Sequence, residues 1–286
     1  MLFREELKEF NNTHPYQVFE TENGIFRYII SGDKNDPPII LFNGLEIQET
    51  WIRYVEGLEK SYRVLLIEYP LYVKTVDELL TEIHALTQAL GIIGPIVMGY
   101  SDGGLHAQFW LRKFPDDISA LILISTLTLD SKYCDDIVTK ELPHKRRYRT
   151  LFKCIPSALM KKALVSKAAS YFNGETEQEQ SDGISYLETM VLVPDYKKKF
   201  IHSVELLWDG AAQNKFSTRE FEPVNGRILL LQPSKDIFTS KDQKKLADLL
   251  PDARVRTMRG GHLSVIMCAE EYIKEIKEFL NGSTDS

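Results

Sequence analysis

The hydrophobic residues of this chain fall into short runs, separated by longer segments in which apolar positions recur with a helical period. Short runs rich in Val, Ile and Leu are typical of strands that are buried on both faces of a parallel sheet. Six such runs are present: Ile39–Phe42, Arg63–Ile67, Ile96–Met98, Ala120–Ile124, Arg227–Gln232 and Ala253–Thr257.

Helices are predicted between most of these runs. The clearest begins at Thr75, because Thr75 and Glu78 have the spacing of a capping box. Apolar residues then recur at helical spacing as far as Leu90. Strands that alternate with helices in this way predict an α/β fold with a mostly parallel, doubly wound sheet.

Two regions depart from the alternation. An Asn-Gly pair at residues 23–24, between two strand-like segments, predicts an N-terminal hairpin over about 16–31. Between residues 128 and 220 the apolar positions keep a helical spacing and no strand-like run is evident. We therefore expect a core domain made of residues 1–127 and 221–286, with residues 128–220 inserted in it as a helical cap. Four aromatic residues of this cap are expected to pack inside the cap rather than line a pocket: Tyr171, Phe172, Tyr186 and Phe200.

Candidate chemistry is concentrated where one predicted strand ends. Residues 99–103 read Gly-Tyr-Ser-Asp-Gly, the G-x-S-x-G pattern of a nucleophile elbow, and a helical pattern follows. Ser101 would sit at the tip of a strained turn, with its hydroxyl directed away from the sheet. Gly99 and Gly103 would be needed there because a Cβ atom at either position would collide with a neighbouring element. Ser101 is thus the candidate nucleophile.

Two further side chains follow predicted strands at the same edge of the sheet. Asp236 comes shortly after the run that ends at Gln232, and His262 follows Gly260-Gly261 after the last run. Because ligands of open parallel sheets bind at the carboxyl ends of the strands, we expect Ser101, Asp236 and His262 to meet. His262 would be the general base and Asp236 the acid that orients it. Asp130, near the end of the Ala120–Ile124 run, is the alternative acid.

Backbone N–H groups should stabilise the developing oxyanion. The two candidates are the N–H groups of Asp102, at the start of the helix after Ser101, and of Leu45, which follows Asn43-Gly44. An ordinary strand-to-helix turn at Leu45 is the alternative. Glu46 is close to this loop and is expected to be a solvated side chain.

Composition narrows the choice of partners and compartment. The net charge of −6 does not favour nucleic acid as a partner. The three cysteines, an odd number without metal-ligand spacing, indicate reduced thiols in the cytoplasm rather than a metal site or a disulfide framework. We expect no secretory signal and no membrane-spanning segment, because no apolar run is long enough. Basic clusters at 145–149 and 197–199 are expected to form solvated helix faces. The sequence is compatible with a homodimer.

The motifs together resemble those of the α/β-hydrolase superfamily over about residues 20–127 and 221–281. The elbow at Gly99–Gly104, the Gly261-His262 pair and the Gly44…Trp51 segment carry the resemblance. Asn43 stands where the superfamily usually has a histidine, which need not matter because the donor in that loop is a backbone N–H. The stretch Tyr69-Pro70-Leu71-Tyr72 is similar to that of maspardin and related bacterial hydrolases.

The resemblance implies one of two functions. The first is a serine hydrolase, without cofactor, that cleaves a small or medium carboxylic ester; thioester, lactone and carbon–carbon substrates stay open. Serine rather than aspartate at position 101 does not fit dehalogenases or epoxide hydrolases, which need a carboxylate nucleophile. The second is a non-catalytic binding protein of the same fold, because maspardin is regarded more as a binding protein than as an enzyme.

Overall fold

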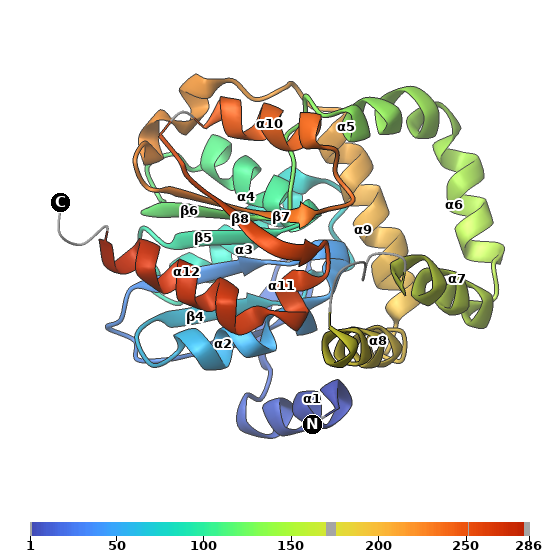
Figure 1. Cartoon of the computed structure of the whole chain (residues 1–286), viewed down its shortest axis with the longest axis horizontal. Helices are drawn as coiled ribbons and strands as arrows, with labels where there is room; N and C mark the ends of the chain where they lie inside the picture. Colours follow the sequence, from blue (N-terminus) through green and yellow to red (C-terminus); the bar gives the residue numbers. More distant parts are fainter. Residues whose placement is uncertain (1, 170–175, 251, 283–286) are drawn as a thin grey trace.

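Eight strands form one sheet at the centre of the computed structural model, which describes residues 2–169, 176–250 and 252–282 (Figure 1). The strands lie in the order β1-β2-β4-β3-β5-β6-β7-β8. Strands β3 to β8 pair in parallel, while β1 pairs with β2, and β2 with β4, in antiparallel fashion. The predicted mostly parallel sheet and the N-terminal hairpin are therefore confirmed. The strands are β1 (Gln17–Thr21), β2 (Gly24–Ser31), β3 (Pro38–Phe42), β4 (Arg63–Ile67), β5 (Ile96–Tyr100), β6 (Ala120–Ile124), β7 (Ile228–Lys235) and β8 (Arg254–Gly261).

Helices cover both faces of the sheet, and alternate residues of each central strand enter the two resulting cores. Ile40 and Leu65 face a core shared with helices α3, α4 and α10. Ile39 and Leu66 face a second core, shared with α1, α2, α11 and α12. Such runs bury both faces of the strand, which is why they read as continuous apolar sequence. The helices are α1 (Phe3–Thr13), α2 (Ile52–Leu58), α3 (Val76–Ala89), α4 (Asp102–Lys113), α10 (Ser240–Leu249), α11 (Ser264–Met267) and α12 (Ala269–Gly282).

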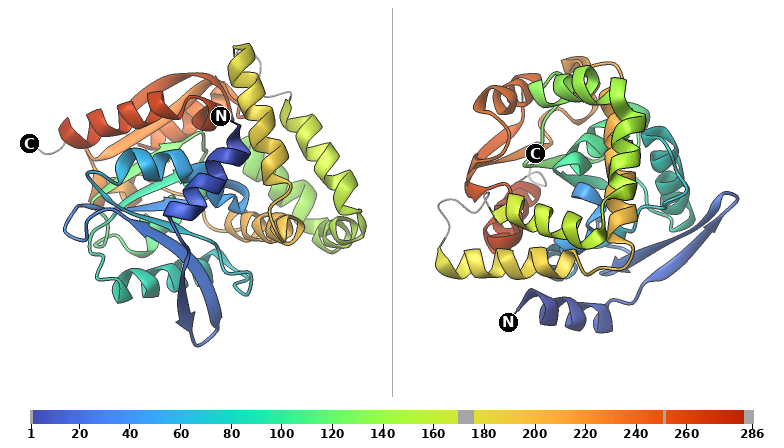
Figure 2. Two further views of the ribbon diagram at one scale, coloured as in Figure 1. Left: turned by 90° about the horizontal axis from the view of Figure 1, so that it is seen from below. Right: turned by 90° about the vertical axis from the view of Figure 1, so that its right-hand side faces the viewer.

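The segment between β6 and β7 contains only helices and turns among its described residues. They gather beyond the end of the sheet, at the right of Figure 1, and Figure 2 shows them from two further sides. The last of them, α9, does not belong to the insertion alone, because Leu206 and Trp208 are buried in the core that covers α3 and α4. The helices are α5 (Lys132–Asp136), α6 (Lys145–Cys154), α7 (Ser157–Ala169), α8 (Glu177–Met190) and α9 (Tyr196–Ala211).

Helix α1 is a feature that the sequence pattern did not reveal. It packs against α8 of the insertion, where the rings of Phe3 and Tyr186 meet edge to face with their centroids 4.9 Å apart. The N–H of Phe3 also donates to the hydroxyl of Ser185. The N-terminus therefore braces the insertion from outside the sheet. Within the described residues, no helix is both long and apolar enough to cross a membrane.

Candidate active site

Ser101 lies at the turn between β5 and α4, in a backbone conformation that L-residues rarely adopt. Its φ is 57° and its ψ is −125°. The neighbouring glycines make this turn possible. A Cβ atom on Gly99 would lie 2.3 Å from the carbonyl oxygen of Gly103, and one on Gly103 would lie 2.3 Å from that of Phe42. Only glycine fits at these two positions without moving the backbone.

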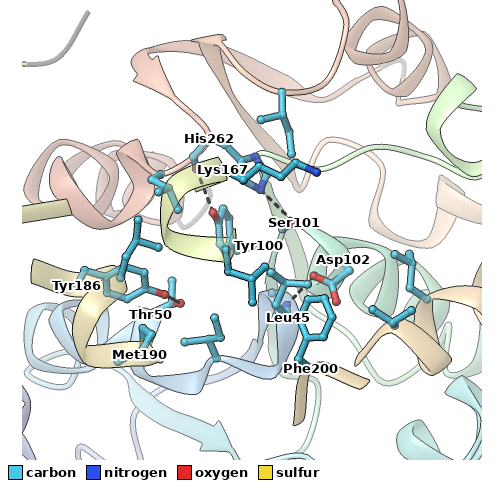
Figure 3. Close-up of a pocket in the computed structure, with 18 of the residues that line it drawn as sticks. Leu45, Thr50, Tyr100, Ser101, Asp102, Lys167, Tyr186, Met190, Phe200 and His262 are labelled. Atoms are coloured by element: carbon cyan, nitrogen blue, oxygen red, sulfur yellow. Dashed lines mark hydrogen bonds between the residues drawn. The ribbon is translucent and has the colours of Figure 1, made fainter. Parts of the chain in front are cut away.

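Ser101, His262 and Asp236 form an unbroken chain of hydrogen bonds. The Nε2 atom of His262 lies 3.0 Å from the Ser101 hydroxyl (Figure 3). Its Nδ1 atom lies 2.8 Å from the Asp236 carboxylate. The Asp236 side chain is only 1% exposed. Strands β7 and β8 extend beyond their apolar runs, so Asp236 and His262 directly follow the strand ends. Both side chains therefore lie at the sheet edge that carries Ser101. The structure thus brings the three predicted residues together.

The alternative acid, Asp130, lies elsewhere. Its half-exposed carboxylate pairs with Lys215 and Lys245. Hydrogen bonds from these two lysines hold the pKa of the Asp130 carboxyl below its usual range. The Asp130 side chain therefore takes part in surface ion pairs, and the carboxylate that accepts the hydrogen bond of His262 Nδ1 is that of Asp236.

Tyr100 and Phe238 hold the imidazole of His262 between them. The Tyr100 hydroxyl donates to the backbone carbonyl of His262 at 3.0 Å, and the two rings are 5.2 Å apart between centroids. Phe238 meets the imidazole edge to face at 5.3 Å. Sequence analysis did not single out either residue, although Tyr100 stands next to the candidate nucleophile.

The loop of residues 43–46 carries the other candidate oxyanion donor. Gly44 approaches Ser101 so closely that a Cβ atom on Gly44 would lie 3.0 Å from the Cβ of Ser101. Leu45 has a left-handed φ of 49°. Its N–H donates to Oδ1 of Asp102 at 2.8 Å, so this donor is directed at a side chain of the elbow itself (Figure 3).

Asn43 and Tyr69 fix this loop from below. The Asn43 amide donates to the carbonyl of Ile67 at 2.6 Å, and the Asn43 N–H donates to the Tyr69 hydroxyl at 3.0 Å. Tyr69 is buried. Asn43 stands where the superfamily usually has a histidine, and Tyr69 belongs to the stretch similar to maspardin. Both residues therefore support the 43–46 loop by hydrogen bonds beneath it.

The expectation that Glu46 is solvated was wrong. Its side chain is 2% exposed and pairs with the imidazole of His202, on α9. Burial raises the pKa of the Glu46 carboxyl to about 7. The partner lies far along the chain, so no local pattern could have indicated this pair.

The two basic clusters differ in how much of them is exposed to solvent. Residues 145–149 lie on a largely exposed face of α6, as expected. Lys199 is instead buried, with its ammonium group 2.6 Å from the carboxylate of Glu68. Lys197 donates to the backbone carbonyls of Lys153 and Ile155 at the end of α6. Lys197 and Lys199 therefore bind the insertion together and to the core, and the expectation of a solvated face was wrong for these two residues. Lys198 is exposed, as expected, and pairs with Asp195.

A cavity of about 300 Å³ opens beside Ser101 and His262. One wall comes from the elbow and the 43–46 loop, and the other comes from helices α7, α8 and α9 of the insertion. Tyr186 and Phe200 line it, which corrects the expectation that they pack only inside the cap; Tyr171 and Phe172 lie outside the described residues (Figure 3). Most lining side chains are apolar, among them Leu105, Leu127, Leu164, Val165, Met190, Val204 and Leu207.

No metal centre is evident in the part of the chain that the structure describes, where no group of three or more His, Cys, Asp or Glu side chains could hold an ion. The burial of Cys134 raises the pKa of its thiol to about 11, so this thiol is inert.

Solved structures of similar shape identify the fold of this chain. The structure of the enol-lactonase from Burkholderia xenovorans LB400 superimposes with a TM-score of 0.69 at 19% identity, covering 93% of this chain and all of that one. A putative lipase from Acinetobacter baumannii AYE gives 0.70 at 16% identity, covering 100% and 98%. The chain has the α/β-hydrolase fold. An α/β-hydrolase enzyme from a Medee basin deep-sea metagenome library gives 0.72 at 17% identity, covering 93% and 97%.

Sequence comparison adds one distant relative of the same fold family. Human epoxide hydrolase 4 is 24% identical over 124 residues, which are 40% of this chain and 34% of that protein. The match therefore spans about a third of the curated relative. No family model matches the sequence.

Proposed function

We propose that this α/β-hydrolase-fold protein is a serine hydrolase that cleaves small or medium carboxylic esters through an acyl-enzyme on Ser101. The observation that carries the proposal is a chain of hydrogen bonds that runs from Ser101, at the tip of a strained elbow, through His262 to the buried side chain of Asp236. Backbone strain of this kind persists only where the surrounding structure enforces it. Presentation of a nucleophile would explain why it is kept here.

The proposed reaction has two halves. His262 takes the proton of Ser101 as its oxygen forms a bond to the acyl carbon, and returns that proton to the leaving alcohol as the carbon–oxygen bond breaks. A water molecule then attacks the acyl-enzyme with His262 again as the base, which releases the acid and restores Ser101. Asp236 holds the imidazole in one tautomer and stabilises its cation. Every step uses side chains of this protein and water.

The shape of the cavity favours an apolar acyl or alcohol group of modest size. A volume of about 300 Å³ lined mainly by aliphatic and aromatic side chains would exclude water from the ester during attack. The names of the structural neighbours, which include an enol-lactonase and a putative lipase, are compatible with esters and with lactones. Thioesters use the same chemistry and stay within the proposal.

Labelling with a fluorophosphonate tests this function without knowledge of the substrate. The reagent should add covalently to Ser101 of the wild-type protein, and Ser101→Ala should remove both the label and ester turnover. An unmodified protein by intact-mass spectrometry, or an adduct on another residue, would favour the second candidate, a non-catalytic binding protein. The features similar to maspardin do not by themselves favour that candidate, because Tyr69 supports the loop from the core.

A further inference from the structure

The N–H of Leu45 is one of the two backbone donors from which an oxyanion hole at this elbow would be built, and it already has an acceptor. It donates to Oδ1 of Asp102 at 2.8 Å. The other donor would be the backbone N–H of Asp102 itself. One of the two donors is therefore directed at an anion that the chain itself supplies.

The second oxygen of the same carboxylate is held by the insertion. The Ser203 hydroxyl, on α9, donates to Oδ2 at 3.0 Å, and Ser203 is only 1% exposed. Its neighbour His202 pairs with Glu46 of the 43–46 loop. Helix α9 therefore contacts both the Asp102 carboxylate and the 43–46 loop, whose Leu45 N–H donates to that carboxylate.

The charge of Asp102 has no basic partner among the described ion pairs, although the side chain is only 7% exposed and lines the cavity. Several titratable groups face it from the packed elements. Glu46, from the 43–46 loop, repels the Asp102 charge, while His262, after β8, favours the charged form of Asp102. Tyr69, which follows β4, and Tyr100, on β5, also face the carboxylate, and their hydroxyls are buried. Burial is the largest influence, and it raises the pKa of the Asp102 carboxyl to about 6.

We propose that the Asp102 carboxylate is an internal anion that occupies the Leu45 donor of the oxyanion hole in the resting enzyme, and that it must turn away or take up a proton before that donor can stabilise the oxyanion of a substrate. This inference rests on the proposed function. Two negative oxygens cannot share the same donor, since like charges at hydrogen-bonding distance strongly oppose each other. A neutral carboxyl group opposes the oxyanion far less. Asp102 then slows the attack of Ser101, and this inhibition is strongest at alkaline pH.

Substitution of Asp102 by asparagine separates this proposal from a simple structural role. Asparagine keeps the size of the side chain and removes its charge. We expect Asp102→Asn to react with a fluorophosphonate about tenfold faster than the wild type at pH 8, because the neutral amide opposes the oxyanion less than the carboxylate does and gives up the Leu45 N–H more readily. The ratio of the two rates should fall towards one at pH 5, where Asp102 of the wild type is protonated. Because both proteins depend on His262, its pKa is measured in each by NMR and the rates are corrected for it.

Asp242 provides a matched control. It is also a buried aspartate near the start of a helix, and it accepts the backbone N–H of Lys132 at 2.8 Å, but it does not line the cavity. Asp242→Asn should leave the labelling rate unchanged at every pH. Ser203→Ala, which removes the contact that holds Oδ2, should accelerate labelling in the same direction as Asp102→Asn but by a smaller factor.

The outcomes are distinct. A slower Asp102→Asn protein at pH 8, or a rate ratio that does not change between pH 5 and pH 8, would overturn the inference and leave the carboxylate as a support for the loop. If Asp102→Asn does not fold, Asp102→Ser takes its place in the same comparison. Labelling of the variant but not of the wild type would support the inference strongly. Absence of labelling on Ser101 in both proteins at every pH would overturn the proposed function itself, and this inference with it.

Discussion

Glu46 and His202 form a buried ion pair that joins the loop beside the nucleophile to helix α9 of the insertion. Nε2 of His202 lies 2.8 Å from the carbonyl of Val73, an acceptor, so this nitrogen carries a proton. Nδ1 faces the Glu46 carboxylate. The pair thus needs one further proton between its two members, and that proton can be lost at moderately alkaline pH.

The first prediction concerns the pH dependence of stability. Burial raises the pKa of Glu46 to about 7. Burial opposes the charged form of His202, but the hydrogen bond and the charge of Glu46 outweigh it, so the pKa of His202 is raised. The unfolded chain releases the Glu46 proton at about pH 4.3 and the His202 proton at about pH 6.5, so the contribution of the pair is fully present only below the lower value and is lost as pH rises through the folded pKa values. We expect Glu46→Gln to cost about 1–3 kcal/mol of unfolding free energy at pH 6 and clearly less at pH 9.

Urea denaturation at the two pH values measures this difference. Glu278→Gln serves as the control, because Glu278 makes only an exposed ion pair with Lys274 one helical turn away. A cost of Glu46→Gln that is the same at pH 6 and pH 9 would show that the pair does not exchange its proton in this range.

The second prediction separates the two acids. Asp236→Asn should keep the fold but lower ester turnover by about 10³–10⁴-fold, because the amide cannot hold the productive tautomer of His262 or stabilise its cation. Asp130→Asn should change turnover little, since Asp130 pairs with surface lysines. Turnover and thermal unfolding are measured for both variants. The reverse order of effects would place the acid on the loop after β6.

The third prediction concerns Tyr100, whose hydroxyl fixes the backbone of His262. Tyr100→Phe keeps the ring against the imidazole and removes one buried hydrogen bond, which leaves the carbonyl of His262 without that donor. We expect a loss of about 1 kcal/mol in stability and a fall in kcat of roughly tenfold with little change in KM, because the base is displaced while the cavity is intact. Steady-state kinetics on an activated ester provide the measurement. A change confined to KM would mean that Tyr100 contacts the substrate rather than positioning the base.

The parts of this site that follow directly from local sequence could be predicted. Ser101 is marked by a strand, a glycine-flanked turn and a helix that are contiguous in the chain. His262 and Asp236 could be placed because each follows a buried strand, and parallel strands end at one edge of the sheet. The mostly parallel sheet followed from the alternation of apolar runs with helical segments, and the hairpin followed from the Asn23-Gly24 turn signal.

The contacts that could not be predicted join residues far apart in the chain. Glu46 is separated from His202, and Glu68 from Lys199, by at least two strands of the sheet and most of the insertion. A charged side chain in a sequence looks solvated unless its partner is known, because an unpaired buried charge is too costly to assume. The Asp102 carboxylate was missed for a related reason: the elbow motif indicates a backbone donor at that position and says nothing of its side chain.

The last prediction concerns the part of the insertion that faces the cavity. Phe200 and Val204 line the cavity from α9. Further along the same helix, Leu206 and Trp208 enter the core. Phe200 is only partly buried, so Phe200→Ala should enlarge the cavity beside the acyl group and cost few core contacts. We expect the preferred acyl chain of p-nitrophenyl esters to become longer, with a melting temperature within about 5 °C of the wild type. Leu159→Ala, on the same insertion but 60% exposed and away from the cavity, should leave the ranking of chain lengths unchanged. Global unfolding of Phe200→Ala would mean that the start of α9 belongs to the main core. An unaltered ranking would mean that the acyl group is selected on the opposite wall, by the 43–46 loop, because that wall is the other surface that reaches Ser101.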